Sequence, residues 1–254
     1  MTAPSPVLPG AEPIDLPGGP VGILVVHGFT GTTQSMRPWA EHLAAAGHTV
    51  VAPRLPGHGT RWQDLNGTGW ADWYAEVERA FDDLRARCEV VFAVGLSMGG
   101  TLVLRLAELR GEQVAGVVVV NAALGSERLD VKLLPVASRL LASRPGIGSD
   151  IKKPGVTELA YDRTPLRAAL SLSRAWPLVV ADLGRISSPV LSYRSVDDHV
   201  VEPLSGRLLL EGVPHAEERL LHDSFHVATL DHDAPVVFEG TLALIRAHAP
   251  TAAG

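Results

Sequence analysis

A serine flanked by glycines is the first feature of the sequence that could do chemistry. Ser97 stands in Gly95-Leu96-Ser97-Met98-Gly99, directly after the apolar run 90–94. A strand that turns abruptly into a helix holds its middle residue in a strained conformation, and only small residues fit two positions before and after it. The spacing therefore predicts that Ser97 is a nucleophile at the start of a helix, where unpaired N–H groups favour an oxyanion.

A serine hydroxyl needs a base to remove its proton, and the sequence offers ten histidines for this role. When the serine lies on a strand–turn–helix, the acid and then the histidine follow on loops after later strands. His226 comes shortly after the expected strand 217–221 and is the predicted base. His222 at the end of that strand, and His232 and His248 near the last helix, are less well placed.

The acid that orients this histidine is expected on the loop after the strand 190–194. Asp197 and Asp198 both have this position. A carboxylate from either residue would accept a hydrogen bond from the imidazole and stabilise its charged form. Position alone does not decide which of the two residues is the acid.

Two backbone N–H groups are expected to hold the oxyanion. Met98, the residue after the nucleophile, supplies one of them. The second is expected from the turn after the first strong strand, His27-Gly28-Phe29-Thr30-Gly31, with Phe29 as the donor. We interpret His27 as a structural hydrogen-bonding residue rather than as a second base.

A metal site is the other chemistry that the histidines near the end of the chain suggest. Six candidate ligands crowd one stretch: His222, Asp223, His226, Asp231, His232 and Asp233. Metal sites do use two histidines spaced by four on a helix. Because residues 225–230 show no helical pattern, we favour the acid–base role of His226 and expect neither a metal nor an organic cofactor.

The elements that must position these residues alternate along the chain. Short β-branched runs are typical of buried parallel strands, and the segments between them have helical spacing. The alternation predicts an α/β fold with a mostly parallel central sheet and helices on both faces. Strands are predicted over 21–26, 49–51, 90–94, 114–120, 189–194 and 217–221, and helices over 36–46, 70–87, 101–109, 203–210 and 235–248.

The alternation breaks between residues 124 and 183. This segment has short apolar patches, several prolines and no clear strand. It is predicted to be a cap of short helices over one end of the sheet, inserted into a core formed by residues 1–123 and 184–254. Its leucines are candidates for lining an acyl tunnel or for packing the cap: Leu124, Leu133, Leu134, Leu140, Leu141, Leu159, Leu166 and Leu170.

Length and composition indicate one globular domain, with 254 residues of which 46% are hydrophobic and 20% charged. A net charge of −6 without a run of Lys or Arg argues against a nucleic-acid partner. The single cysteine, Cys88, cannot form an internal disulfide and is interpreted as a packing residue. Residues 1–20 lack the pattern of a signal peptide, and no stretch reaches the ~18 apolar residues of a membrane span, so a cytoplasmic protein is expected.

Five short motifs together resemble the bacterial carboxylesterase/monoacylglycerol lipase family. The resemblance extends from about Val21 to Ala247 and is weakest in the insertion. It implies an α/β-hydrolase fold with a small helical cap, and hydrolysis of short- to medium-chain esters, with monoacylglycerols as natural candidates. The motifs are His27-Gly28-Phe29-Thr30-Gly31, Gly57-His58-Gly59, Gly95-Leu96-Ser97-Met98-Gly99-Gly100, Asp198-His199-Val200-Val201 and Ser224-Phe225-His226-Val227.

The resemblance also implies roles for two acidic residues. It assigns the acid to Asp198, and Glu158 resembles an acidic cap residue that holds the glycerol end of a monoglyceride. A lipid substrate suggests transient contact of the cap with a membrane without stable insertion, although the sequence shows no amphipathic basic helix. The alternatives are a thioesterase or acyltransferase using the same triad, a cofactor-free haloperoxidase or C–C hydrolase on the same scaffold, and a non-catalytic ligand-binding protein. The sequence predicts no oligomeric state.

Overall fold

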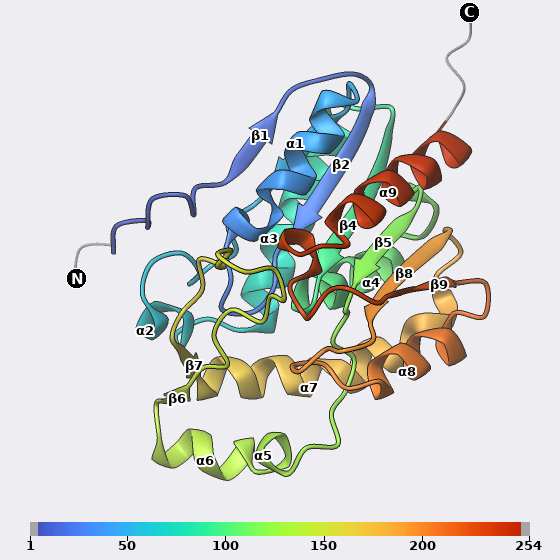
Figure 1. The fold of residues 1–254 in the computed structure, drawn as a ribbon. Helices are drawn as coiled ribbons and strands as arrows, with labels where there is room; N and C mark the ends of the chain where they lie inside the picture. Colours follow the sequence, from blue (N-terminus) through green and yellow to red (C-terminus); the bar gives the residue numbers. More distant parts are fainter. Residues whose placement is uncertain (1–4, 250–254) are drawn as a thin grey trace, which may run out of the picture.

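A seven-stranded sheet forms the centre of the computed structural model, which describes residues 5–249 (Figure 1). Its strand order is β1-β3-β2-β4-β5-β8-β9, and only the edge strand β1 runs antiparallel to its neighbour. The predicted α/β fold with a mostly parallel sheet is confirmed. The strands are β1 (Ile14–Leu16), β2 (Val21–Val26), β3 (Thr49–Ala52), β4 (Val90–Leu96), β5 (Val117–Val120), β8 (Val190–Ser195) and β9 (Glu217–Leu221).

Helices cover both faces of this sheet, so side chains on both faces of its inner strands are buried. Val25 belongs to the core that α1 and α9 cover, whereas its neighbours Leu24 and Val26 belong to the core on the opposite face. This burial on both faces explains why the strands read as continuous apolar runs. The covering helices are α1 (Arg37–Ala45) and α9 (Ala234–His248) on one face, and α3 (Trp70–Arg85), α4 (Met98–Arg110) and α8 (Leu204–Gly212) on the other.

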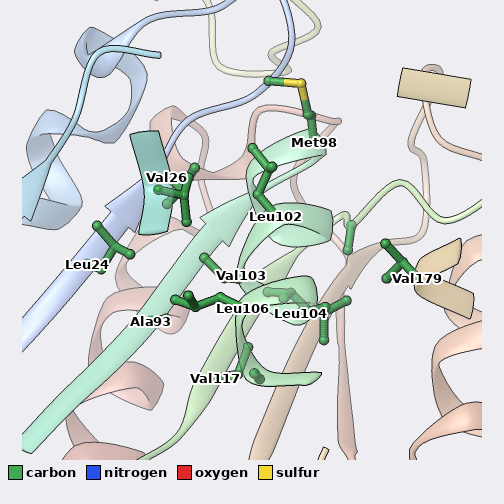
Figure 2. Close-up of a cluster of buried hydrophobic side chains, with 14 of the residues drawn as sticks. Leu24, Val26, Ala93, Met98, Leu102, Val103, Leu104, Leu106, Val117 and Val179 are labelled. Carbon is green, nitrogen blue, oxygen red and sulfur yellow. The ribbon is translucent and has the colours of Figure 1, made fainter. Parts of the chain in front are cut away.

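The packing of α4 on the sheet fixes the turn that carries Ser97. Figure 2 shows side chains of α4 in contact with the strands beneath it. Because α4 begins directly after Ser97, this contact sets both the position and the direction of the turn. The buried residues in Figure 2 include Leu24, Val26, Ala93 and Val117 from the strands and Leu102, Val103 and Leu106 from α4.

Residues 124–183, here called the cap segment, lie beyond the carboxyl ends of the strands. In Figure 1, α5 and α6 lie on the far side of α7 from the sheet. The prediction of short helices without a strand is wrong in two respects: β6 and β7 form an antiparallel pair, and α7 is 17 residues long. The elements are α5 (Leu129–Lys132), α6 (Leu134–Leu140), β6 (Ser143–Pro145), β7 (Arg163–Pro165) and α7 (Leu166–Asp182).

Several short elements were also not predicted, among them β1 and α2 (Trp62–Leu65). α4 begins at Met98 rather than at residue 101, and β5 begins at Val117 rather than at residue 114. Within residues 5–249, no helix has the length and apolar character needed to cross a membrane. The remaining helical turns are η1 (Thr33–Met36), η2 (Gly111–Gln113), η3 (Leu183–Arg185) and η4 (Ala228–Leu230).

Candidate active site

Ser97 occupies a strained turn between β4 and α4. Its backbone angles are φ 55° and ψ −119°, a region that residues other than glycine rarely adopt. The N–H of Ser97 donates to the carbonyl of Val120 at 2.9 Å, which ties the turn to β5. A Cβ on Gly95 would collide with the backbone of Gly99, and a Cβ on Gly99 would collide with the Val26 carbonyl. The two glycines are therefore required by the close approach of backbone on both sides of the serine.

His226 and Asp198 form a buried hydrogen-bonded pair. His226 Nδ1 donates to Asp198 Oδ2 at 2.8 Å, and the two side chains are 10% and 5% exposed. The other carboxylate oxygen, Oδ1, accepts from the N–H groups of Val200 at 2.7 Å and Val201 at 2.8 Å. Asp197, the other candidate acid, is exposed. The structure thus brings Asp198, and not Asp197, into contact with the histidine.

The charges around this pair make the histidine a stronger base. Burial by itself lowers the pKa of His226, but the adjacent Asp198 carboxylate, with smaller contributions from Glu158 and Asp150, raises it above the ordinary value. Burial by itself raises the pKa of Asp198, but the His226 ring and two backbone N–H groups hold it below the ordinary value. The pair therefore combines an ionised carboxylate with an imidazole suited to accept a proton.

Ser97 and His226 line the same cavity beneath the cap segment. Of the eight leucines expected to line a tunnel or pack the cap, only Leu134 lines this cavity. Leu133, Leu140 and Leu141 are exposed, so the prediction was wrong for these three. The apolar cap residues that do line the cavity are Val131, Leu134, Ile147, Ala169, Leu172 and Trp176.

The turn after β2 lies directly against Ser97. A Cβ on Gly28 would come within 3.4 Å of the Ser97 Cβ. Within the described residues, the N–H of Phe29 has no protein acceptor. Met98 is the first residue of α4, and the N–H at that position has no acceptor within a helix. The N–H groups of Phe29 and Met98, the two predicted oxyanion donors, therefore have no acceptor among the described residues, and the turn that carries Phe29 contacts Ser97.

His27 fixes the peptide plane that carries the Phe29 N–H. Its Nε2 accepts from the N–H of Leu55 at 3.1 Å, so the ring proton is on Nδ1, which donates to the Gly28 carbonyl at 2.9 Å. Burial lowers the pKa of His27 to about 4, and the ring is neutral at physiological pH. Because the Gly28 carbonyl and the Phe29 N–H belong to one planar peptide unit, this bond orients both. The contact agrees with the structural role expected for His27.

Glu158 lines the cavity from the cap side. Its Oε1 lies only 2.5 Å from the position that a Cβ on Gly31 would occupy, so the carboxylate covers the turn after β2. The following residue, Leu159, is held to the core, because its N–H donates to Gln34 Oε1 at 2.9 Å and its carbonyl accepts from Thr32 Oγ1 at 3.1 Å. Burial raises the pKa of Glu158 above its ordinary value.

Comparison with protein families gives a match over most of the chain. The model of the alpha/beta hydrolase family matches residues 23–243. The chain belongs to this family. A thermostable monoacylglycerol lipase of Bacillus sp. (strain H-257) is 44% identical over 251 residues, which cover 98% of this chain and 100% of that protein. A carboxylesterase of Bacillus subtilis (strain 168) is 26% identical over 90% of this chain and 93% of its own length.

Solved structures of lipolytic enzymes are similar to this alpha/beta hydrolase. One, from work on the metagenome-derived enzymes LipS and LipT, has a TM-score of 0.93 and 44% identity, with 96% of this chain and 100% of that chain covered. The monoacylglycerol lipase of Paleococcus ferrophilus has a TM-score of 0.78 at 20% identity over 94% of this chain and 99% of its own, a likeness of fold alone. The resemblance drawn from the motifs is confirmed.

Asn121 is a residue of this alpha/beta hydrolase site that sequence reasoning missed. It follows β5 directly, is buried, and has a left-handed φ of 48°. Its Nδ2 donates to the carbonyl of His226 at 2.8 Å, and its Oδ1 accepts from the N–H of Ser195 at 2.7 Å. The signal that could have found it is a polar residue placed directly after a strand of four valines.

Asp231, one of the six residues that suggested a metal site, is engaged in hydrogen bonds to backbone. The carboxylate of Asp231 accepts from the N–H groups of Lys152, Lys153 and Phe225, at 2.7, 2.9 and 2.9 Å. In the part of the chain that the structure describes, no three His, Cys, Asp or Glu side chains are grouped so that they could hold a metal ion. The structure thus offers no support for the alternative of a metal site in this stretch.

Proposed function

We propose that the chain is a serine carboxylic-ester hydrolase that acts through an acyl-enzyme on monoacylglycerols and short- to medium-chain esters. The observation that carries this proposal is the buried His226–Asp198 pair, which lines the same cavity as a serine on a strained strand–helix turn. The 44% identity to a monoacylglycerol lipase over nearly the full length supports the substrate class.

The proposed mechanism uses groups of the chain alone. His226 accepts the proton of Ser97 as Oγ attacks the ester carbonyl, and Asp198 stabilises the imidazolium that forms. The N–H groups of Phe29 and Met98 stabilise the oxyanion, at roughly 3 kcal/mol for each donor. His226 then protonates the departing alcohol and later activates the water that releases the acid. No metal or organic cofactor takes part in these steps.

We propose that residues 124–183 are a cap over a core of residues 1–123 and 184–254, of which 1–4 and 250–254 lie outside the described residues. In this proposal, the apolar wall of the cavity receives the acyl chain. Glu158 accepts hydrogen bonds from the free hydroxyls of the glycerol group. The place of its carboxylate, in the cavity and over Gly31, supports this role.

We also propose that α5 and α6 make transient contact with a lipid surface. Four apolar side chains, spaced by four, three and four residues, lie along these helices, and each is more than half exposed. This spacing is that of one helical face. Exposed basic residues stand on the same two helices and directly before α5, in a chain of net charge −6. The apolar stripe is Leu129, Leu133, Val136 and Leu140, and the basic residues are Arg128, Lys132 and Arg139.

A cytoplasmic location is proposed as well, with a small ester rather than a nucleic acid as the partner of the site. Cys88 is buried and unpaired, so the described fold needs no disulfide. The negative net charge disfavours binding to a phosphate backbone. Fractionation of the native cells, with activity followed in each fraction, checks the location.

The proposal is tested by the turnover of esters that share one acyl chain. Wild type and Ser97→Ala are assayed on a monoacylglycerol, a p-nitrophenyl ester and an acyl thioester. We expect wild type to hydrolyse the monoacylglycerol and Ser97→Ala to lose at least about 1,000-fold in kcat. A fluorophosphonate probe should label wild type and the control Ser173→Ala, whose serine lies on α7 outside the cavity lining, but not Ser97→Ala.

Three results would contradict the proposal. Retained turnover in Ser97→Ala, or no labelling of wild type, would show that Ser97 is not the nucleophile. A wild-type kcat/KM that is highest on the thioester would instead make the chain a thioesterase.

A further inference from the structure

Asp150 reaches from the cap segment to the two loops that carry the acid and the base. It lies between β6 and β7, and its side chain is 11% exposed. Asp150 Oδ2 accepts from the N–H of His226 at 3.1 Å and from the N–H of His199 at 3.3 Å. Asp150 Oδ1 accepts from His199 Nδ1 at 2.9 Å. His199 directly follows Asp198, so one carboxylate oxygen contacts the backbone of both loops.

We propose that Asp150 is a positioning residue of the reaction. From the cap segment, it holds the loops that carry His226 and Asp198 in fixed positions relative to each other. A shift of either loop relative to the other would break one of the two bonds to Oδ2. This inference deepens the proposed ester hydrolysis and rests on it. In this inference, the cap segment both contacts the substrate and orients the base His226.

The backbone of His226 is held on both sides by polar side chains. Asp150 binds its N–H, and Asn121 Nδ2 donates to its carbonyl at 2.8 Å. The next N–H, that of Val227, donates to the backbone carbonyl of Asp150 at 3.0 Å. Displacement of a reacting group by ~1 Å can cost on the order of 100-fold in rate. The loss of one of these two side chains should therefore reduce kcat.

A second carboxylate joins the same two segments, but here the cap segment donates the hydrogen bonds and the carboxylate lies on the segment after His226. Asp231, which follows η4, accepts from the N–H groups of Lys152, Lys153 and Phe225. Residues 150–153 of the cap segment are thus attached to residues 226–231 by hydrogen bonds that each of the two segments donates to the other. Because Asp231 keeps this attachment when Asp150 is replaced, the effect of Asp150 on the base is separable from loss of the cap.

Asp150 affects His226 through its negative charge as well as through its hydrogen bonds. A negative charge near the imidazolium stabilises it, and Asp150 contributes to the raised pKa of His226. Removal of that charge should lower the pKa of His226. The titratable groups that face this region are Asp198, Glu158 and Asp150 around His226, His199 against Asp150, and Lys152, whose Nζ pairs with Asp223 at 2.9 Å.

The test compares Asp150→Ala and Asp150→Asn with the control Asp162→Asn, which alters an exposed carboxylate of the same segment. On a p-nitrophenyl ester we expect Asp150→Ala to lose about 10- to 100-fold in kcat with KM within about 2-fold. Asp150→Asn keeps one acceptor oxygen and should lose less. In both variants the acid limb of the rate profile should move to lower pH, and Asp162→Asn should match wild type.

Nuclear magnetic resonance provides a readout that does not depend on turnover. The pKa of the His226 ring, followed without substrate, should fall in both Asp150 variants and stay unchanged in Asp162→Asn. Unfolding midpoints verify that the variants are folded. The inference is overturned if the pKa of the His226 ring in the Asp150 variants equals that of wild type, or if these variants differ from wild type in KM alone. Absence of ester hydrolysis by wild type would refute the proposed function, while the titration would still decide the role of Asp150.

Discussion

His226 is surrounded by three carboxylates, and these decide the pH range in which the ring can act as a base. Asp198, Glu158 and Asp150 each stabilise the imidazolium, and together they raise the pKa of the ring above its ordinary value despite burial. A general base must be unprotonated in the free enzyme. Activity should therefore be lost as pH falls through a pKa higher than the ~6.5 of an ordinary histidine.

Glu158→Gln should separate glycerol binding from chemistry. A hydrogen bond to a charged group contributes about 1.5–3 kcal/mol, so we expect KM for a monoacylglycerol to rise about 10-fold or more. The ethyl ester of the same fatty acid lacks the glycerol hydroxyls and should keep its KM within about 2-fold. Because one negative charge near His226 is lost, the acid limb should move to lower pH. Steady-state kinetics on both esters across pH measure these effects.

The matched control for this change is Glu127→Gln, an exposed carboxylate of the same segment. It should leave KM for both esters and the acid limb as in wild type. Equal losses of Glu158→Gln on the two esters would contradict a role in binding glycerol.

Residues that belong to a local pattern were predictable, whereas those that act across the chain were not. Ser97 is identified by its neighbours, and His226 by its order along the chain. The choice between Asp197 and Asp198 needed a resemblance, because both have the same sequence position. Asn121 and Asp150 bind the backbone of His226 from 105 and 76 residues away, and no spacing rule reports such contacts.

Elements with long or strongly apolar patterns were predictable from sequence, and short ones were not. β2 and β4 are continuous apolar runs and α9 has helical spacing, and both patterns are imposed by burial. By contrast, β6 and β7 are three residues each, and they exist only because they pair across the cap segment. Pro177 lies inside α7, and proline within a helical pattern usually indicates an end, which is why short helices were expected.

The exposed stripe on α5 and α6 should govern binding to lipid surfaces. We expect the fourfold replacement of Leu129, Leu133, Val136 and Leu140 by Gln to weaken binding to phosphatidylglycerol vesicles by at least about 10-fold. Burial of one large apolar side chain contributes roughly 1.5–3 kcal/mol, and four are removed. Wild-type binding should also fall with added salt, because the basic residues on the same helices are screened. Vesicle cosedimentation measures both effects.

The control is Leu178→Gln, which replaces an exposed leucine of α7 outside the stripe and should bind as wild type does. Hydrolysis of a soluble p-nitrophenyl ester should be the same in all three proteins. Unchanged vesicle binding in the fourfold variant would refute the contact, and a change from dimer to monomer would show that a second copy covers the stripe.

At the scale of the whole molecule, α4 connects the site, the sheet and the cap segment. It begins at the Ser97 turn and carries Arg105 and Glu108 toward its other end. Arg105 Nη1 donates to Glu108 Oε2 at 2.8 Å and to Asp182 at 2.6 Å, which joins α4 to the end of α7. Glu108 is fully buried, and its Oε1 has no hydrogen-bond partner. This buried carboxyl makes global stability depend on pH.

Glu108→Gln should therefore stabilise the folded protein at alkaline pH. Burial raises the pKa of Glu108 to about 7 despite Arg105, from an ordinary 4.5. For a raised carboxyl pKa, stability is full below the unfolded value and decreases as pH rises through the folded value. The neutral glutamine avoids this loss of stability, and Arg105 retains its ion pair with Asp182.

We expect the free energy of unfolding of Glu108→Gln to exceed that of wild type by up to about 3 kcal/mol at pH 8, and to equal it near pH 4. Urea unfolding between these pH values measures the difference. The control Glu112→Gln, which replaces an exposed carboxylate just beyond α4, should follow wild type at every pH. If Glu108→Gln were less stable than wild type at pH 8, the carboxylate would be a net stabilising partner of Arg105, and the burial of its charge would not be the dominant effect.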